Sequence, residues 1–591
     1  MANIAAADNT KVFALNKWLG LNESPDGDTG LKMGEAASMR NFRITRESHL
    51  QIRPGYAPVC TLSDGNPVQG MWSGYVNGVF HFLAACGGHV WDIDTDTWTA
   101  NDIGTIEDAK THFFGFGQKV YLLNGTEYYV WDGNGTVKVV GGYVPIVATA
   151  VPPEGGGTLL ERVNVLTGKR RVYYSPDGEA TAFTLPEQSV DEVVSVTGTD
   201  INWTLSGVDG TLTFESAPPK GVNTVCITYR KGTGDRSRVC KMRYSEFYNG
   251  DSDTRVFLYG DGTHKVIYSD LDENGVASAE YFPDMNEMAV GSANTPVTAA
   301  IRHYGRLVVF KADSAYTADY TATTLQTGVV TAAFYCTPLN REIGCAAYGQ
   351  AVLVKNNPRT LHGRAVYEWG LAGNNTRDER NAKRISERVE NTLSVFNLEN
   401  CFTFDDERRQ EYYICYGDEV VVNNYGNDTW YYYTNVSVRC MVNLNGELYF
   451  GTDNGVLMHF SRKYRNDNLA PIDARWESGS MDFGLDYKRK YSATIWVSIK
   501  PESQGRVTVS AESNKKSDYA DKEVSAGLSS FLNTTFNHWS FGTNRKPQVE
   551  RVRLKVKKFT FYKLIFESNS ASSTATILAT DFQIRYTGNV K

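Results

Sequence analysis

Two stretches of the chain repeat each other at an offset of 40 residues. Residues 79–92 read VFHFLAACGGHVWD and residues 119–132 read KVYLLNGTEYYVWD, so both end in Val-Trp-Asp. Each stretch holds two apolar runs joined by Gly-Gly or Asn-Gly, and these pairs tolerate the positive φ that a tight hairpin turn requires. Hairpins that recur at about this period are typical of stacked or circular arrays of four-stranded units. The repeat therefore predicts a β-propeller.

The same scheme of glycine, strand, polar turn and second strand returns later in the chain. It occurs at residues 255–270, 303–320, 346–369 and 443–460, while residues 401–434 supply three strands with acidic and Asn-Gly turns. Counting these units predicts about six or seven blades, which is within the usual range for propellers. The blades are expected in two parts, residues 61–150 and residues 236–475.

The remaining segments predict two further β-domains and a lead-in. The linker composition VPPEGGG, followed by short strands with Pro-Asp-Gly and Pro-Pro turns, predicts a small β-sandwich inserted at residues 151–235. Apolar and polar residues then alternate from Trp476 onward, which predicts a carboxy-terminal β-sandwich at residues 476–591. Residues 1–60 are interpreted as an extended arm that straps a β-domain closed, with a docking arm as the alternative.

Composition agrees with an all-β fold class. The 591 residues include 53 Gly and 34 Tyr, and 41% are hydrophobic, so several β-rich cores can be filled. No run approaches the roughly 18–20 apolar residues of a membrane span, and the amino terminus lacks the flank and apolar stretch of a signal peptide. Nine cysteines are scattered without CxxC spacing, which predicts buried, reduced thiols. We expect a protein made in the cytosol, with no membrane partner.

The formal net charge of −7 is unevenly distributed along the chain. Residues 477–591 hold 18 Lys and Arg against 11 Asp and Glu, a net +7, whereas the preceding 476 residues hold 42 against 56, a net −14. Within the basic part, Arg551, Arg553, Lys555 and Lys557 alternate with apolar residues and are expected on one face of a strand. That face suits DNA phosphates or an acidic neighbouring subunit, and the alternative is a solvated outer face or a protected edge.

Few residues suggest chemistry. Asp92, Asp94 and Asp96 alternate as weak candidates for a Ca²⁺ site, but the glycine and distal glutamate of a calcium loop do not follow, so a turn is favoured. The histidines lack metal-ligand spacing, and no phosphate-binding glycine loop is present. We therefore predict no catalytic residue and no cofactor. Three carboxylates at the mouth of a propeller, as in five-bladed glycosidases, remain open as an alternative.

Several short patterns resemble one known family. The lead-in contains Gly20-Leu21-Asn22, Met33-Gly34-Glu35-Ala36, Met39-Arg40-Asn41-Phe42 and Arg53-Pro54-Gly55 in that order. This order resembles the opening of β-propeller tail proteins of tailed bacteriophages. The insert is similar to accessory β-domains of phage tail proteins, and Glu-Ser-Gly, Asp-Phe-Gly and Lys-Arg-Lys at residues 477–490 resemble the final β-sandwich of the same family.

The resemblance implies a non-enzymatic virion protein assembled in the bacterial cytoplasm. Such proteins form rings, commonly of six subunits, that make the nozzle or tail tube around the DNA ejection channel below the portal and adaptor. Neighbouring tail proteins, fibres and passing genomic DNA would be the partners. Two alternatives stay open: a carbohydrate-binding or glycoside-hydrolysing propeller, and an interaction scaffold that never joins a virion.

Overall fold

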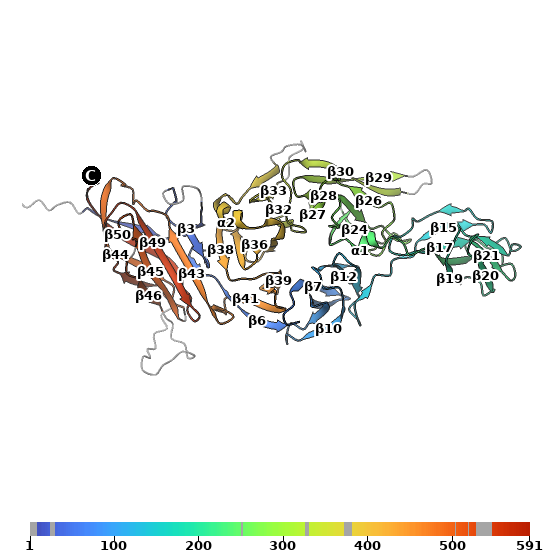
Figure 1. Cartoon of the computed structure of the whole chain (residues 1–591), viewed down its shortest axis with the longest axis horizontal. Helices are drawn as coiled ribbons and strands as arrows, with labels where there is room; N and C mark the ends of the chain where they lie inside the picture. The colour runs from blue at the N-terminus through green and yellow to red at the C-terminus, as the bar shows by residue number, and fades with distance from the viewer. Residues whose placement is uncertain are drawn as a thin grey trace, which may run out of the picture. The chain divides into compact units, whose positions relative to one another are not determined.

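Almost every regular element of the protein is a β-strand (Figure 1). The computed structural model describes residues 9–23, 30–249, 252–324, 330–370, 381–502, 504–517, 519–526 and 546–590. Within them the strands run from β1 to β50, and the α-helices α1 (Ser237–Cys240) and α2 (Glu390–Val395) are short. None of the described helices is long and apolar enough to cross a membrane. The predicted all-β class is confirmed.

The chain forms two compact units. Unit 1 contains Met1–Val68, Gly363–Glu368 and Lys383–Lys591, and unit 2 contains Gln69–His362 and Trp369–Ala382. Unit 2 is built from the earlier propeller sheets and the inserted domain. Unit 1 combines the last propeller sheets with the amino-terminal lead-in and the carboxy-terminal sandwich.

Unit 2 contains four-stranded sheets whose strands follow one another along the chain. The first consists of β7 (Val68–Val76), β8 (Val79–Cys86), β9 (His89–Ile93) and β10 (Ala100–Thr105). The second consists of β11 (His112–Phe116), β12 (Lys119–Leu123), β13 (Tyr128–Trp131) and β14 (Lys138–Val139). The third consists of β23 (Tyr244–Asn249), β24 (Ser252–Tyr259), β25 (Lys265–Tyr268) and β26 (Glu287–Ala289), and the fourth of β27 (Val297–His303), β28 (Arg306–Lys311), β29 (Ala315–Thr324) and β30 (Val330–Asn340).

Three more sheets of this kind follow. The fifth consists of β31 (Val352–Val354), β32 (Asn357–His362), β33 (Ala365–Trp369) and β34 (Ala382–Arg384). The sixth, in unit 1, consists of β35 (Phe402–Asp406), β36 (Glu411–Tyr416), β37 (Glu419–Asn424) and β38 (Thr429–Thr434). The seventh consists of β39 (Cys440–Leu444), β40 (Glu447–Gly451), β41 (Val456–Ser461) and β6 (Gly55–Thr61). These up-and-down sheets are propeller blades, and the predicted β-propeller is confirmed.

The seventh blade is completed by an amino-terminal strand. β6 pairs antiparallel with β41, so a strand from the start of the chain forms the outer part of a blade whose other strands lie about 380 residues later. Along the chain, β6 is followed directly by β7, the first strand of the first blade. Because it is a long-range pairing, hairpin periodicity alone does not predict it.

The repeated stretch forms equivalent hairpins in the first two blades, which pack face to face. Leu83 and Val90 of the first blade share a core with Val120, Leu122 and Trp131 of the second. Trp131 is 3% exposed, whereas Trp91, its counterpart in the repeat, is half-buried. The two tryptophans therefore occupy the same position of the repeat with different packing.

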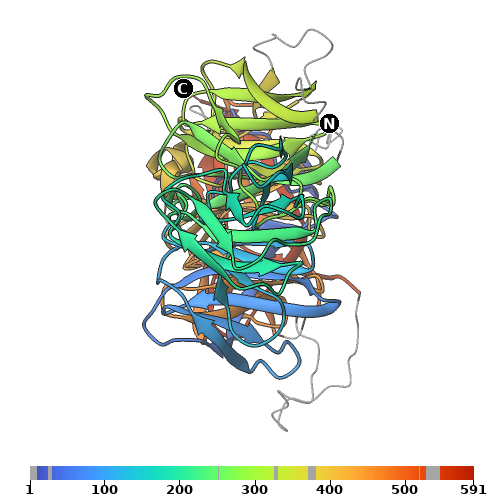
Figure 2. The ribbon, with the colours of Figure 1, turned by 90° about the vertical axis from the view of Figure 1, so that its right-hand side faces the viewer.

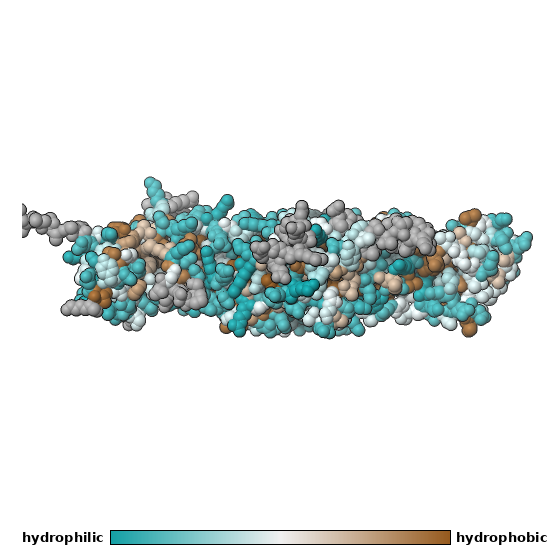
Figure 3. All heavy atoms as spheres, turned by 90° about the horizontal axis from the view of Figure 1, so that it is seen from above, coloured by the Kyte–Doolittle hydropathy of each residue, from teal (hydrophilic) through white to brown (hydrophobic). Residues whose placement is uncertain are grey.

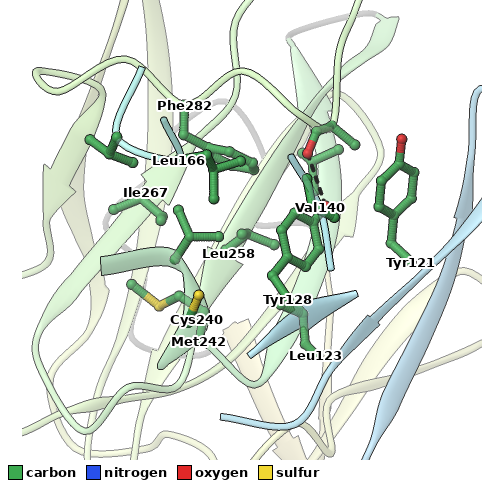
Figure 4. Packing of buried hydrophobic residues seen from close by; sticks show 14 of the residues in the cluster. Tyr121, Leu123, Tyr128, Val140, Leu166, Cys240, Met242, Leu258, Ile267 and Phe282 are labelled. Carbon is green, nitrogen blue, oxygen red and sulfur yellow. Dashed lines mark hydrogen bonds between the residues drawn. The ribbon is translucent and has the colours of Figure 1, made fainter. Parts of the chain in front are cut away.

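The second and third blades bury a larger core (Figure 4). Tyr121, Leu123 and Tyr128 of the second blade meet Leu258 and Ile267 of the third. The Tyr128 hydroxyl donates to the carbonyl of Ala279 at 2.9 Å, so the ring is buried with its polar atom satisfied. The second blade packs against the first blade on one side and the third blade on the other, so apolar residues occur on both faces of its sheet.

The insert is a two-sheet sandwich with a core of its own, and its teal strands face the viewer in Figure 2. One sheet has the order β16 (Thr158–Leu159), β15 (Ile146–Val151), β17 (Lys169–Tyr174), β22 (Val225–Arg230), β19 (Glu192–Thr197). The other has the order β18 (Ala182–Thr184), β21 (Thr211–Phe214), β20 (Trp203–Ser206). Val172 and Ile227 of the first sheet pack against Phe183 and Leu212 of the second. The predicted inserted β-sandwich is confirmed.

One buried amide ties the insert to the third blade. Asn164 is 2% exposed and donates to the carbonyls of Tyr143 and Glu280, both at 2.8 Å. Its side-chain oxygen accepts the N–H groups of Leu166 and Phe282. All the hydrogen-bonding capacity of the amide is therefore used at this junction.

The carboxy-terminal sandwich contains two sheets, which we call sheet A and sheet B. Sheet A has the order β4 (Phe42–Ile44), β5 (Leu50–Ile52), β50 (Thr576–Asn589), β44 (Lys488–Ile499), β47 (Gln548–Val552), with β1 (Thr10–Leu15) on β50 and β48 (Val556–Phe559) on β44. Sheet B includes β3 (Glu35–Arg40), β43 (Ala470–Ser478), β49 (Tyr562–Ser570), β45 (Gly505–Ser513) and β46 (Lys522–Ala526), with β2 (Gly20–Leu21) on β3. Through β42 (Asn466–Asp467), sheet B continues into the seventh blade.

The lead-in, interpreted from the sequence as an extended arm of residues 1–60 that straps a β-domain closed, supplies strands to both sheets of this sandwich. β1, β4 and β5 belong to sheet A and β3 to sheet B. Trp18, between them in sequence, is fully buried and meets Trp476 edge-on at 4.8 Å between ring centroids. The first and last parts of the chain therefore fold as one domain.

Candidate functional site

The three aspartates considered for a metal do not converge. The Asp92 carboxylate bonds to Nδ1 of His81 at 2.9 Å. Asp94 accepts the N–H groups of Asp96 at 2.8 Å and Thr97 at 3.1 Å, and these bonds hold the pKa of Asp94 below its usual value. Over the described part of the chain, no group of three or more His, Cys, Asp or Glu side chains is placed to hold a metal ion. Asp94 thus forms the turn between β9 and β10.

Polar groups at the first strands of neighbouring blades bond to one another. In unit 2 the N–H of Thr111, just before β11, donates to the carbonyl of Gln69 on β7 at 3.0 Å. On the next pair, Nε2 of His112 on β11 lies 2.9 Å from Oγ of Ser245 on β23. Burial lowers the pKa of His112 to about 4, so its imidazole is neutral near pH 7. These groups join blades and leave little free for chemistry.

Glu246 continues this series between the third and fourth blades. Its carboxylate accepts its neighbour Phe247's N–H at 3.0 Å and a backbone N–H from Arg302 on β27. Burial raises the pKa of Glu246 to about 7, because a charged carboxylate loses hydration there. A carboxyl group that exchanges protons near neutrality is a candidate general acid, and so its surroundings matter.

A glycosidase needs a second carboxylate near the first. Among the described residues, the first strands of the seven blades carry acids at two places. These are Glu246 on β23, and Asp405 and Asp406 on β35. Asp406 is buried beside Arg409. Its carboxylate also accepts a hydrogen bond from the side-chain amide of Asn443 at 3.1 Å, and this bond joins the sixth and seventh blades. In unit 2, the first strands therefore supply one carboxylate and no acidic partner for it.

The four basic residues predicted to share a face lie along an interrupted strand. β47 ends at Val552 and β48 begins at Val556, and both pair with β44 at the edge of sheet A. Arg551, Arg553, Lys555 and Lys557 are all exposed, while the apolar residues between them are buried. The alternation predicted from sequence survives the break, which is absorbed where Lys555 adopts a φ of 54°.

Three further residues complete this face and were not singled out from sequence. In the register of sheet A, Tyr491 lies between Lys557 and Arg585, and Trp496 lies between Arg551 and Asp581. Both rings are half-buried, and Arg585 is exposed. Trp496 and Arg585 stand at polar positions of their alternating patterns, but only the strand pairing brings them beside the basic residues.

Unit 1 also contains a polar pocket of about 280 Å³. Arg53, Arg462, Arg465, Glu502 and Thr574 contribute to its lining. Arg53 is fully engaged, since Asp467 binds its guanidinium at 2.8 and 2.5 Å. Its volume is below the usual range for small-molecule sites of about 300–1,000 Å³.

All nine cysteines are free thiols, as expected, and seven of them are buried. Burial raises the pKa of Cys240 to about 11 and that of Cys345 to about 12. Thiols that resist ionisation are poor nucleophiles and poor metal ligands. These cysteines are packing residues.

Comparison with known proteins gives similarity of fold only. No protein-family model matches the chain, and no curated protein matches it. The WD40 domain of Pan2 from Neurospora crassa is 7% identical, with a TM-score of 0.32 over 68% of this chain and 95% of that one. An exo-β-1,3-galactanase from Phanerochaete chrysosporium is 10% identical, with a TM-score of 0.18 over 83% of this chain and 98% of that one. Similarities this weak carry no information about activity.

Proposed function

We propose that this protein is a non-enzymatic structural subunit of a bacteriophage tail. In this proposal several copies, commonly six, form a ring that serves as nozzle or tail tube around the DNA ejection channel, below the portal and adaptor. The ring docks neighbouring tail proteins or fibres, contacts the passing genome without sequence preference, and assembles in the host cytoplasm. The sequence patterns of the lead-in, the insert and the last sandwich support the tail assignment.

One observation carries the structural role: polar side chains on the first strands of the blades form hydrogen bonds to neighbouring blades. His112 and Ser245 bond across one pair of blades, Glu246 bonds to the backbone of Arg302 across the next, and Asp406 bonds to Asn443 in unit 1. In an enzyme of this fold such positions would point toward substrate. Here they stiffen the contacts between blades, which suits a subunit of a rigid wall.

The pairing of the amino-terminal strands with late strands of the chain supports the same role. β6 completes the last blade, and β1, β3, β4 and β5 are built into the carboxy-terminal sandwich. A domain whose sheets join early and late segments of the chain resists local opening, because many long-range pairings must break together. That property suits a protein exposed to mechanical load during genome ejection.

Negative-stain imaging of the purified full-length chain tests the ring. Closed rings of a single subunit number are expected, and particles that stay monomeric across a range of protein and salt concentrations would contradict the proposal. Native mass spectrometry of the same sample gives the subunit number independently of image interpretation.

One observation favours a second candidate, a glycoside-hydrolysing or glycan-binding propeller. Glu246 has the raised pKa of a general acid and lies on a first strand. Under this alternative, incubation with bacterial surface polysaccharide releases reducing sugar, and Glu246→Gln abolishes the release. Equal readings from wild type, Glu246→Gln and a boiled sample would eliminate the hydrolase.

A further inference from the structure

The outer face of sheet A is a basic and aromatic surface without a partner in the described chain. It comprises the rows Asp581–Trp496–Arg551 and Arg585–Tyr491–Lys557, together with the neighbouring side chains of Arg553 and Lys555. We call this the sandwich face. Its five cations stand along the edge strands and on β50, and the two half-buried rings lie between them.

None of the five cations is neutralised within the described residues. Arg551, Arg553, Lys555, Lys557 and Arg585 make no ion pair there. In contrast, other arginines of the sandwich, such as Arg475 with Glu477 and Glu567, are paired. One acid, Asp581, lies on the sandwich face, two strands from Arg551. The face therefore carries a net positive charge that only something outside the sandwich can neutralise.

The first blade carries the opposite charge. Between Arg53 and Lys110 the sequence contains seven Asp and Glu residues and no Lys or Arg. Six of these acids are exposed. Five of the six lie on the outermost strand β10 and in the segments on either side of it: Asp94, Asp96, Asp102, Glu107 and Asp108. We call this the blade edge.

The polar partners of the blade edge do not remove its charge. Asp102 bonds to Nδ1 of His89, and Asp108 accepts from the amide of Gln69. The turn formed by Asp94 uses backbone N–H groups. Apart from a histidine that is charged only when protonated, no cation pairs with these acids in the described part of the chain.

We propose that the sandwich face of one copy of this chain binds the blade edge of a second copy. The contact is heterologous, because different surfaces of the two copies meet, and repeated contacts of this kind close into a ring when the rotation between copies allows it. This inference rests on the proposed ring and names the surfaces that build it. Five exposed cations meet five exposed acids.

The composition of the sandwich face favours a protein partner over DNA. Trp, Tyr and Arg are the residues most enriched at the energetic centres of protein interfaces, where water is excluded. Contacts to duplex DNA of any sequence are made chiefly to phosphates and do not require aromatic rings. A face with Trp496 and Tyr491 set between arginines and lysines gives a contact that is both steered by charge and able to bury apolar surface.

Two charge-reversed variants test the contact. The sandwich variant carries Arg551→Glu, Arg553→Glu and Lys557→Glu, and spares Lys555 because its backbone φ is 54°. The edge variant carries Asp96→Lys, Glu107→Lys and Asp108→Lys, and spares Asp94 because its carboxylate forms a turn. A control variant reverses Lys169, Lys220 and Lys231 in the insert.

Ring assembly is measured by native mass spectrometry and sedimentation velocity. Each variant alone is expected to need at least about tenfold more protein for half-assembly, since like charges then face each other. The control variant assembles as wild type does. An equimolar mixture of the two variants regains rings in which they alternate, because each reversed surface now meets its complement, and this recovery also shows that both variants are folded.

The contradicting results separate this inference from the proposed function. If wild type forms rings and the sandwich variant forms them equally well, the inference is wrong and the ring proposal stands. If wild type forms no rings under any condition, both fail. If the sandwich variant assembles normally but no longer retains a short DNA duplex that wild type binds, the sandwich face is a nucleic-acid surface and the inference is overturned.

Discussion

Trp91 and Trp131 occupy the same place in a repeated sequence but not the same environment. Trp131 is 3% exposed and belongs to the core between the first two blades, whereas Trp91 is half-buried and its ring lies tilted against that of His89. We expect Trp131→Ala to lower the free energy of unfolding by about 3–5 kcal/mol, because it leaves a large cavity. Trp91→Ala should cost clearly less.

Urea unfolding followed by tryptophan fluorescence and by circular dichroism measures both variants. Trp91→Ala is the matched control, since it removes the same side chain from the equivalent strand. Equal losses in the two variants would contradict the difference in packing described for the two blades.

Glu246 makes the stability of the propeller depend on pH. Its folded pKa of about 7 lies above the unfolded value of 4.5, so the folded state binds the proton more tightly. Stability from this group is therefore present below about pH 4.5 and is lost as the pH rises through 7, by up to about 3 kcal/mol.

Glu246→Gln keeps an oxygen that accepts the two N–H groups but cannot ionise. Compared with this variant, wild type should lose stability between pH 4.5 and pH 8, as measured by unfolding transitions over that range. Parallel profiles for the two proteins would mean that Glu246 does not titrate in the folded blade.

At the scale of elements, local patterns predicted hairpins well and long-range pairing poorly. The Gly-Gly and Asn-Gly hairpins, the insert and the final sandwich follow from turn residues and period-two alternation, which are local properties. The pairing of β6 with β41, and of β1 with β50, joins segments hundreds of residues apart. No turn residue or periodicity in the sequence identifies such partners. The sequence therefore predicts an extended arm and does not show which strands the arm joins.

The candidate surface shows the same limit. The four basic residues were visible in sequence because they alternate along one stretch. Trp496 and Arg585 come from different strands, and only the register of sheet A places them beside Arg551 and Lys557. On the side of the molecule seen in Figure 3, hydrophobic residues form small, separate groups among hydrophilic ones. A surface of mixed aromatic and basic residues does not form a large hydrophobic patch, so hydropathy alone does not reveal it.

Trp18 tests whether the lead-in is part of the sandwich. The ring is fully buried, packs on Trp476 and Phe566, and donates from Nε1 to the carbonyl of Leu578 at 3.3 Å. Trp18→Ala should destabilise the carboxy-terminal sandwich by about 3–5 kcal/mol, although the substitution is more than 400 residues away in sequence.

Hydrogen exchange followed by mass spectrometry locates that effect. Faster exchange is expected in β44, β49 and β50, with the insert strands unchanged. Val12→Ala on β1 serves as the control, since Val12 is 66% exposed. Unaltered exchange in β49 and β50 of the Trp18 variant would contradict the shared core.

At the scale of the whole molecule, an interface made by the sandwich face and the blade edge must respond to salt. The Debye length falls from about 10 Å at 0.1 M to about 3 Å at 1 M ionic strength, which screens exposed charges. Rings formed at low salt should therefore shift toward smaller species as sodium chloride rises to 1 M. Sedimentation velocity measures the shift, and assembly that strengthens with salt would indicate an apolar interface instead.

The central claim is that the protein is a structural part of a phage tail. Immunogold electron microscopy of purified particles, produced from a genome that encodes this chain, tests it most directly. Antibody against the chain is predicted to label intact particles at the tail, close to its junction with the capsid or along the tube. Particles that carry no label at the tail, with the protein recovered only in the soluble fraction of the lysate, would contradict the account.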